Sequence, residues 1–165
     1  MNLIVAIGED GAIGRCGSLI WKISDDLKRF KALTTGHAVI MGRKTWESLP
    51  KKPLPGRKNI VVTRQKGFRA EGAEVAHSIN EAIEMSGEDP DTFVIGGAEI
   101  YKAFMPYSDR IYLTRVYAGC EDADAFLHFG EKDAWHLTEM SEINQTPEGL
   151  KYQYLTYQRE RNETK

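Results

Sequence analysis

Residues 37–47, HAVIMGRKTWE, hold the pattern that decides the fold. Positions 38–41 are all apolar, and a short uninterrupted run of this kind is typical of a strand buried on both faces. We expect a strand over 37–42 and a short helix over 43–49, directly after the glycine. A buried strand that leads straight into a helix is the unit of a parallel α/β sheet, so this stretch predicts that fold class.

The same unit recurs on both sides of this stretch. We expect further strands over 2–7, 58–63, 73–76, 92–97 and 110–118, and helices over 24–34, 79–87 and 98–104. The segments 134–143 and 151–160 alternate with period two, which predicts an antiparallel hairpin joined by 144–149. Residues 8–18 contain four glycines and are expected to form a mobile loop. The prediction is a single α/β domain over residues 1–165: a mixed, mainly parallel eight-stranded sheet, four helices on both faces, a C-terminal antiparallel hairpin, and a frayed tail over 159–165.

Composition and charge exclude several classes of function. The 165 residues are 41% hydrophobic and 28% charged, and the net charge of −2 leaves no strongly basic face for a nucleic acid. An apolar run long enough to cross a membrane is absent, and we expect a cytoplasmic monomer. The four histidines show no metal-ligand spacing, so no metal site is expected. Cys16 and Cys120 are expected to be free thiols, with a redox-dependent disulfide as the alternative.

Three expected strand ends carry residues that suit a phosphorylated ligand. Gly42, Arg43, Lys44 and Thr45 follow the first of these strands, Thr63 and Arg64 follow the second, and the diglycine of VIGGAEIY (94–101) follows the third. Glycine permits close approach of the backbone to a phosphate, and two arginines can clamp a phosphomonoester such as the 2′-phosphate of NADP. The fingerprint G-x-G-x-x-G is absent after the first strand, which disfavours a standard Rossmann domain.

One acid of SDDLKRF (24–30) lies on the apolar side of the expected helix. At about 100° per residue, Asp26 falls in the same stripe as the apolar side chains, whereas Asp25 faces water; that stripe consists of Ile23, Leu27, Phe30 and Leu33. Two interpretations remain open. With Ser24 as N-cap, both acids complement the helix dipole, or the buried acid serves a ligand.

Arg57 follows a Pro-Gly turn in LPGRKN (54–59). It is either an ordinary surface arginine or a two-pronged donor for the carboxylate of an anionic substrate.

Taken together, six segments resemble a dihydrofolate reductase of the bacterial, chromosomally encoded type. They occur in the family's order and spacing and cover residues 2–118 densely: VAIGEDGAIG, WKISDDLKRFK, VIMGRKTWESLP, PLPGRKNIVVTR, FVIGGAEIY and IYLTRV. The resemblance implies hydride transfer from NADPH to C6 of 7,8-dihydrofolate, with protonation at N5 to give tetrahydrofolate. It also implies binding of antifolate-type small molecules.

The resemblance also implies roles for individual residues. Asp26 and Trp21 would be catalytic, with Thr114 bonded to Asp26, and the pKa of Asp26 would be raised in the empty pocket. The implied substrate-binding residues are Ile4, Val5, Asp26, Leu27, Phe30, Lys31, Leu49, Leu54, Arg57, Ile95 and Thr114. The implied cofactor-binding residues are Ala6, Ile13, Gly14, Leu19, Gly42, Arg43, Lys44, Thr45, Val62, Thr63, Arg64, Gly96, Gly97, Ala98, Glu99, Ile100 and Tyr101, with a cis peptide between the two glycines at 96 and 97.

Two loops depart from the family pattern. Ile20 replaces the usual proline before Trp21 in the segment 9–23, which acts as a lid in the family. Either Asp124 or Asp122 would bond the lid from the loop after the sixth strand. Two other functions remain as alternatives: a related NADPH reductase acting on a pyrimidine-type intermediate, and a nucleotide-binding module without turnover.

Overall fold

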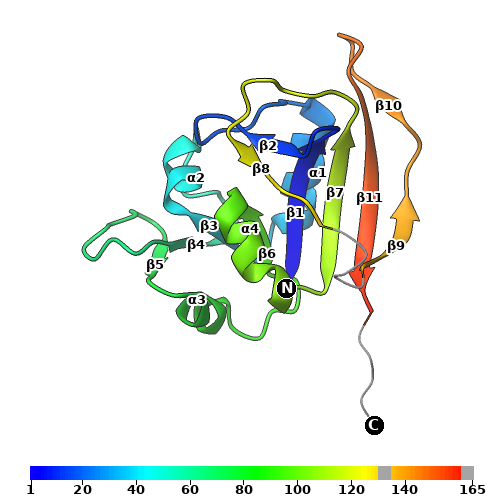
Figure 1. Ribbon diagram of the computed structural model, residues 1–165. Coiled ribbons are helices and arrows are strands. Elements are labelled where there is room, and N and C mark those ends of the chain that lie inside the picture. The colour runs from blue at the N-terminus through cyan, green and yellow to red at the C-terminus, as the bar shows by residue number, and fades with distance from the viewer. Residues whose placement is uncertain (130–134, 161–165) are drawn as a thin grey trace.

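A central sheet organises the computed structural model, in which residues 1–129 and 135–160 are described (Figure 1). Its strand order is β10-β11-β7-β1-β6-β3-β4-β5, and β9 joins as a ninth strand along β11. The bounds are β1 (Asn2–Gly8), β3 (Ala38–Gly42), β4 (Lys58–Val62), β5 (Glu74–Ala76), β6 (Phe93–Gly96), β7 (Arg110–Val116), β9 (Trp135–Met140), β10 (Asn144–Gln145) and β11 (Lys151–Arg159).

The sheet is parallel except at its C-terminal edge. β1 pairs in parallel with β6 and β7, and β3 with β4 and β6, whereas β11 is antiparallel to β7, β9 and β10. The predicted mixed, mainly parallel sheet is therefore confirmed, and all eight predicted strands are present. The additional strand β10 was expected to be part of the hairpin loop. The backbone N–H of Tyr154 donates to Ser141 Oγ at 2.9 Å rather than to a carbonyl of the neighbouring strand. This interruption of the backbone ladder separates β9 from β10.

Four α-helices cover both faces of the sheet: α1 (Ser24–Thr34), α2 (Arg43–Ser48), α3 (Ile79–Ser86) and α4 (Ala98–Phe104), the last continued by the 3-10 turn η1 (Met105–Tyr107). Alternate residues of β3 belong to different apolar clusters, because successive side chains of a strand point to opposite faces. Ile40 packs in the cluster that contains residues of α3 and α4, and Met41 in the cluster of α1 and α2.

Three local predictions are wrong. Ser24 is the first residue of α1 rather than its cap, because the carbonyl of buried Ile23 already accepts the Leu27 N–H at 3.0 Å. Residues 12–14 are no mobile loop: β2 (Ala12–Gly14) pairs with β8 (Ala125–Phe126), since Ala12 is buried against the core. The predicted tail begins too early, because Arg159 is still paired in β11, while 161–165 lie outside the described residues.

No helix in the described part of the chain combines the length and apolar character that crossing a bilayer requires.

Candidate functional site

Asp26 lies in the first turn of α1 and faces the sheet, as its position in the apolar stripe predicts. It is half-buried, and its Oδ1 accepts a hydrogen bond of 2.6 Å from the hydroxyl of Thr114 on β7. Asp25 is exposed, and its carboxylate accepts a bond of 3.2 Å from the hydroxyl of Tyr152. The two neighbouring acids therefore have different surroundings: Asp26 is half-buried and bonded to β7, whereas Asp25 is exposed and bonded to β11.

An apolar cluster lies on the face of the sheet that α1 covers. It brings together predicted substrate residues from five segments: Ile4, Phe30, Leu49, Leu54 and Ile95. Leu27, the next residue after Asp26, is 44% exposed, although a leucine of a helix in contact with a sheet is normally covered. Val5 differs from the others, because its side chain belongs to the cluster on the opposite face of the sheet. Lys31 is exposed on α1.

Arg57 is held in place by the groups around it. Its Nε donates to the carbonyl of Pro55 at 2.9 Å, and its Nη1 donates to the hydroxyl of Thr34 at 3.2 Å. Its guanidinium carbon lies 5.9 Å from the centre of the Phe30 ring. Partial burial lowers the pKa of Arg57 from its ordinary value. A guanidinium fixed beside an aromatic ring in this way can bind a carboxylate in one orientation.

The predicted phosphate-binding junctions meet at one edge. β6, β3 and β4 are neighbouring parallel strands, so their carboxyl ends lie together, and Gly42, Thr63 and Gly97 directly follow or end them. The Gly96–Gly97 peptide is cis, as predicted. A Cβ on Gly42 would lie 3.0 Å from Ile100 Cγ1, whereas one on Gly97 would meet only Thr45 Oγ1 at 3.9 Å. Gly42 therefore allows Ile100 to pack closely against the backbone, and Gly97 leaves the backbone open to a ligand.

The remaining predicted cofactor residues occupy this edge or its rim. Lys44, Arg64 and Glu99 are exposed, and Val62 and Ala98 are half-buried beside them. Arg43 is engaged, because its Nη1 lies 2.9 Å from Glu47 Oε1.

Trp21 and Tyr101 both contact β1, at its carboxyl end and at its middle respectively. A Cβ on Gly8 would lie 2.3 Å from Trp21 Cη2, so the indole rests directly on the backbone there. The hydroxyl of buried Tyr101 donates to the carbonyl of Ile4 at 2.7 Å. Ala6 is opposite Thr114 in the β1–β7 register, which places the predicted nicotinamide side next to Asp26. Ile13 is buried, Gly14 is half-buried, and Leu19 is 52% exposed.

Comparison with known proteins decides the family. The family model for dihydrofolate reductase matches residues 1–159. The chain belongs to the dihydrofolate reductase family. It is 40% identical to a dihydrofolate reductase of Neisseria meningitidis over 159 residues, covering 96% of this chain and 98% of the relative. It is 43% identical to one of Mycobacterium leprae over 163 residues, with coverages of 96% and 98%.

A solved structure agrees with this assignment. The dihydrofolate reductase of Enterococcus faecalis, complexed with NADP(H) and RAB-propyl, superimposes with a TM-score of 0.87 at 31% identity, covering 97% of this chain and 96% of that one. The family reaction is NADPH-dependent reduction of dihydrofolate, and its members bind antifolate inhibitors.

The carboxyl group of Asp26 is electrostatically costly in the ligand-free dihydrofolate reductase fold. Burial raises the pKa of Asp26, and the Thr114 hydrogen bond and the positive charge of Arg29 offset this only in part. No cation of the described residues lies within ion-pair distance of it. Because the pKa of Asp26 is higher in the folded than in the unfolded state, the contribution of this group to stability is fully present below the unfolded pKa of 3.8. That contribution is lost as pH rises through the folded pKa.

We therefore expect Asp26→Asn to stabilise the ligand-free protein. Replacing the ionised group by an amide removes the desolvation penalty, and the free energy of unfolding at pH 7 should rise by about 0.5–2 kcal/mol. Urea unfolding at several pH values measures it, and the gain should shrink as pH falls towards 4. Asp25→Asn, the exposed neighbour, is the control and should show no such gain. A loss of stability at pH 7 would contradict the assigned burial cost.

The lid segment contacts the loop that carries β8. Asp124 Oδ2 accepts the backbone N–H of Cys16 at 2.8 Å, and Asp122 forms an exposed ion pair of 3.2 Å with Arg15. The two acids that the sequence left as alternatives thus both contact the lid, and Asp124 is the one bonded to its backbone. Cys16 and Cys120 are free thiols, and the Sγ of Cys120 donates to Asp122 at 3.1 Å.

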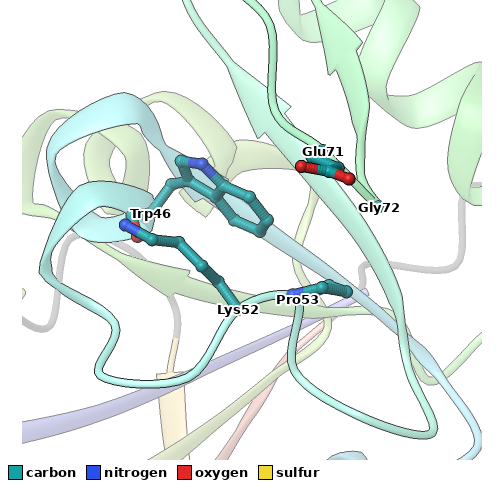
Figure 2. Close-up of a pocket in the computed structure, with 5 residues that line it drawn as sticks. All are labelled: Trp46, Lys52, Pro53, Glu71 and Gly72. Atoms are coloured by element: carbon teal, nitrogen blue, oxygen red, sulfur yellow. The ribbon is translucent and has the colours of Figure 1, made fainter.

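Two further features lie outside the predicted site. A hollow of about 510 Å³ is lined by Trp46, Lys52, Pro53, Glu71 and Gly72, none of which is a predicted site residue. Figure 2 shows Lys52 next to the ring of Trp46, with Glu71 across the hollow.

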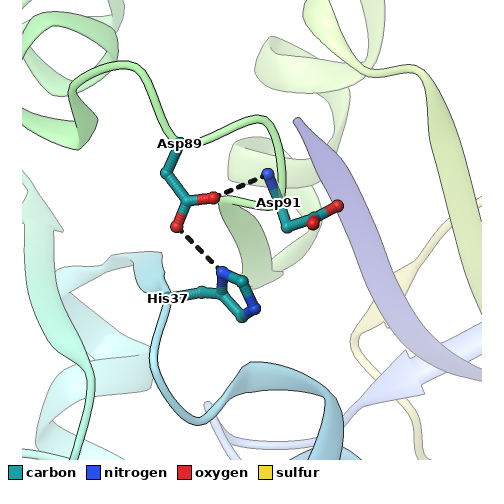
Figure 3. A group of neighbouring side chains, drawn as sticks. All are labelled: His37, Asp89 and Asp91. Carbon is teal, nitrogen blue, oxygen red and sulfur yellow. Dashed lines mark hydrogen bonds and ion pairs between the residues drawn. The ribbon is translucent and has the colours of Figure 1, made fainter.

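A histidine and two acids gather before the amino ends of β3 and β6, away from the carboxyl edge (Figure 3). His37 Nδ1 lies 2.9 Å from Asp89 Oδ2, and the N–H of Asp91 donates to Asp89 Oδ1 at 2.9 Å. Their possible ligand atoms lie within 4.8 Å of one another. Sequence spacing missed this group because 52 residues separate His37 from Asp89.

Sequence reasoning also missed Arg29, Tyr112 and Tyr154, which lie beside Asp26. The guanidinium carbon of Arg29 is 4.2 Å from the Tyr154 ring centre and 5.9 Å from that of Tyr112. Tyr112 and Tyr154 share the sheet face of Thr114, since their strands pair in register with Tyr154 opposite Thr114. The period-two patterns of the two strands indicate that these tyrosines face the same side as Thr114. They do not indicate where the Arg29 side chain lies.

Proposed function

We propose that this chain reduces 7,8-dihydrofolate to 5,6,7,8-tetrahydrofolate with NADPH, and that Asp26 is the residue that binds and polarises the pterin ring. The observation that carries the proposal is the half-buried carboxylate of Asp26, which accepts a bond from Thr114 on the sheet face of an apolar cluster. Among the described residues, no cation lies at ion-pair distance from it. A protein rarely buries a charge without compensation, and a ligand that donates hydrogen bonds would supply it.

In this mechanism the carboxylate of Asp26 accepts hydrogen bonds from the 2-amino group and N3 of the pterin. This polarises the ring and supports protonation at N5, with water as the immediate donor. Trp21, resting on Gly8, helps to hold that water. The apolar cluster orients the flat ring and excludes bulk solvent. The proposed substrate-binding residues are Ile4, Val5, Leu27, Phe30, Lys31, Leu49, Leu54, Arg57, Ile95 and Thr114. Val5 would contribute only its backbone, because its side chain lies on the opposite face of the sheet.

The edge formed by β6, β3 and β4 suits NADPH, which supplies the hydride when bound. The open approach at Gly97 and the two basic side chains after Gly42 fit a phosphorylated dinucleotide. We assign cofactor binding to Ala6, Ile13, Gly14, Leu19, Gly42, Arg43, Lys44, Thr45, Val62, Thr63, Arg64, Gly96, Gly97, Ala98, Glu99, Ile100 and Tyr101.

One assay tests the function. Purified protein is mixed with NADPH, and nicotinamide absorbance is followed after addition of dihydrofolate. Loss of absorbance that depends on dihydrofolate supports the proposal. Turnover with a pyrimidine-type substrate alone would favour the related reductase, and binding of NADPH without turnover would favour a binding module. The related reductase of a pyrimidine-type intermediate would not need Arg57 or an acid at position 26.

The bond between Asp124 and the lid gives a separate prediction. Asp124→Ala removes the acceptor for the Cys16 N–H, and we expect NADPH to dissociate about two- to tenfold faster, because the lid loses one exposed hydrogen bond worth about 0.5–1.5 kcal/mol. Stopped-flow dissociation measures it. Asp122→Ala is the matched control, with a smaller change expected from losing an exposed ion pair. Equal effects of both variants would show that general charge, rather than the backbone bond, holds the lid.

We also propose that the whole chain forms one domain that works as a cytoplasmic monomer and binds no nucleic acid. Supporting this, β1 near one end of the chain pairs with β7, which pairs with β11 near the other end. The net charge of −2 is unfavourable for polyanion binding.

A further inference from the structure

Arg29 is a half-buried cation that the proposed function does not use. It lies on α1 one turn after Asp26, between the helix and the face of β7 and β11. Its guanidinium stacks on Tyr154, with 4.2 Å between its carbon and the ring centre. Among the described residues, no partner bonds its buried Nη1. Native proteins seldom leave a buried N–H of a charged group unpaired, so this arrangement requires an explanation.

The surroundings of Asp26 contain several titratable groups. Asp25 lies on the same helix, Tyr101 on α4, Tyr112 on β7, and Tyr152 and Tyr154 on β11; Glu139 on β9 acts on Arg29. Carboxyl and phenol groups carry no positive charge in either protonation state. Arg29 supplies the positive charge among them.

We infer that Arg29 is a positioning residue for the reaction: its charge, held one helical turn from Asp26 by the rings of Tyr112 and Tyr154, keeps Asp26 ionised and ready to bind the pterin. The inference rests on the proposed function of Asp26. It explains why the guanidinium is buried although it forms no ion pair with that carboxylate.

The separation of the two charges is the essential feature. A direct ion pair would occupy the carboxylate oxygens that the pterin needs. Stacking on Tyr154 holds the guanidinium back, so its charge acts through space while the carboxylate keeps its free acceptor sites. Side chains three residues apart on a helix lie on neighbouring positions, close enough for this effect. Burial lowers the pKa of Arg29 from its ordinary value, but an arginine stays charged at neutral pH.

The test removes the charge and keeps the bulk. In Arg29→Leu, the titration midpoint of the Asp26 carboxyl carbon, followed by ¹³C NMR in the ligand-free protein, should move to higher pH. The pH midpoint of single-turnover hydride transfer should move in the same direction. Arg29→Lys should restore much of both midpoints, because it keeps a positive charge. Lys28→Leu, which removes an exposed cation from the same helix, should leave both close to wild type.

The outcomes are distinct. An unchanged NMR midpoint in folded Arg29→Leu overturns the inference, as does a shift of equal size in Lys28→Leu. If the leucine variant does not fold, Arg29→Gln provides the same comparison with a neutral hydrogen-bonding group. If wild-type protein shows no dihydrofolate reduction while the NMR midpoint still moves in Arg29→Leu, the proposed function fails and the charge coupling stands.

Discussion

Asp26→Asn is expected to lower the rate of dihydrofolate reduction at pH 7 by about 10²–10⁴-fold, the usual contribution of a group that assists proton transfer. An amide keeps the shape of the side chain and can still accept the Thr114 hydroxyl. It cannot present two anionic oxygens to a ligand, so polarisation of the ring is lost. NADPH affinity should stay close to wild type, because the phosphate-binding edge is formed by other strands.

Asp25→Asn is the matched control for this prediction. Both acids lie in the first turn of α1, and both complement the helix dipole. The control should change the rate by no more than about twofold, as surface substitutions usually do. Similar losses in both variants would show that the acids serve the helix. Near-normal turnover in Asp26→Asn would remove the basis of the proposed mechanism.

Arg57→Leu is expected to weaken binding of dihydrofolate about 10- to 200-fold, the loss of about 1.5–3 kcal/mol from hydrogen bonds to a charged group. The bonds from Arg57 to Pro55 and Thr34 hold the guanidinium in one orientation, and the substrate's glutamate carboxylate is the assigned partner. Fluorescence titration with dihydrofolate measures the affinity. Because the hydride step itself is not involved, the maximal rate at saturating substrate should fall much less than the affinity.

Three companion variants sharpen this result. Arg57→Lys keeps the charge without the planar pair of donors, and should recover only part of the affinity. Thr34→Val removes one support and should give a smaller loss than Arg57→Leu. Lys58→Leu removes the neighbouring exposed cation, which lies 3.7 Å from Glu74, and should have little effect. An affinity unchanged in Arg57→Leu would mean that the arginine is an ordinary surface residue.

The main architecture could be predicted from local patterns. Buried apolar runs such as 38–41 and the helix over 24–34 depend on neighbours within a few residues, so their types and approximate bounds follow from periodicity. The same reasoning placed Asp26 on the buried face of its helix. It mistook Ser24 for the cap, because the capping position depends on how deeply Ile23 is buried in the folded protein.

The amino-acid sequence by itself determined the α/β alternation, the glycine and basic residues at the strand ends, and the anomalous acid in an apolar stripe. The family resemblance named Thr114, 88 residues away, as the partner of that acid, and the structure confirms the bond. Only the tertiary structure showed the charge of Arg29 held back by Tyr154. It also decided that β2 pairs with β8 and that Asp124 bonds the lid backbone. These contacts join segments far apart in the chain, and they form only once sheet register and burial have brought those segments together, which local periodicity does not specify.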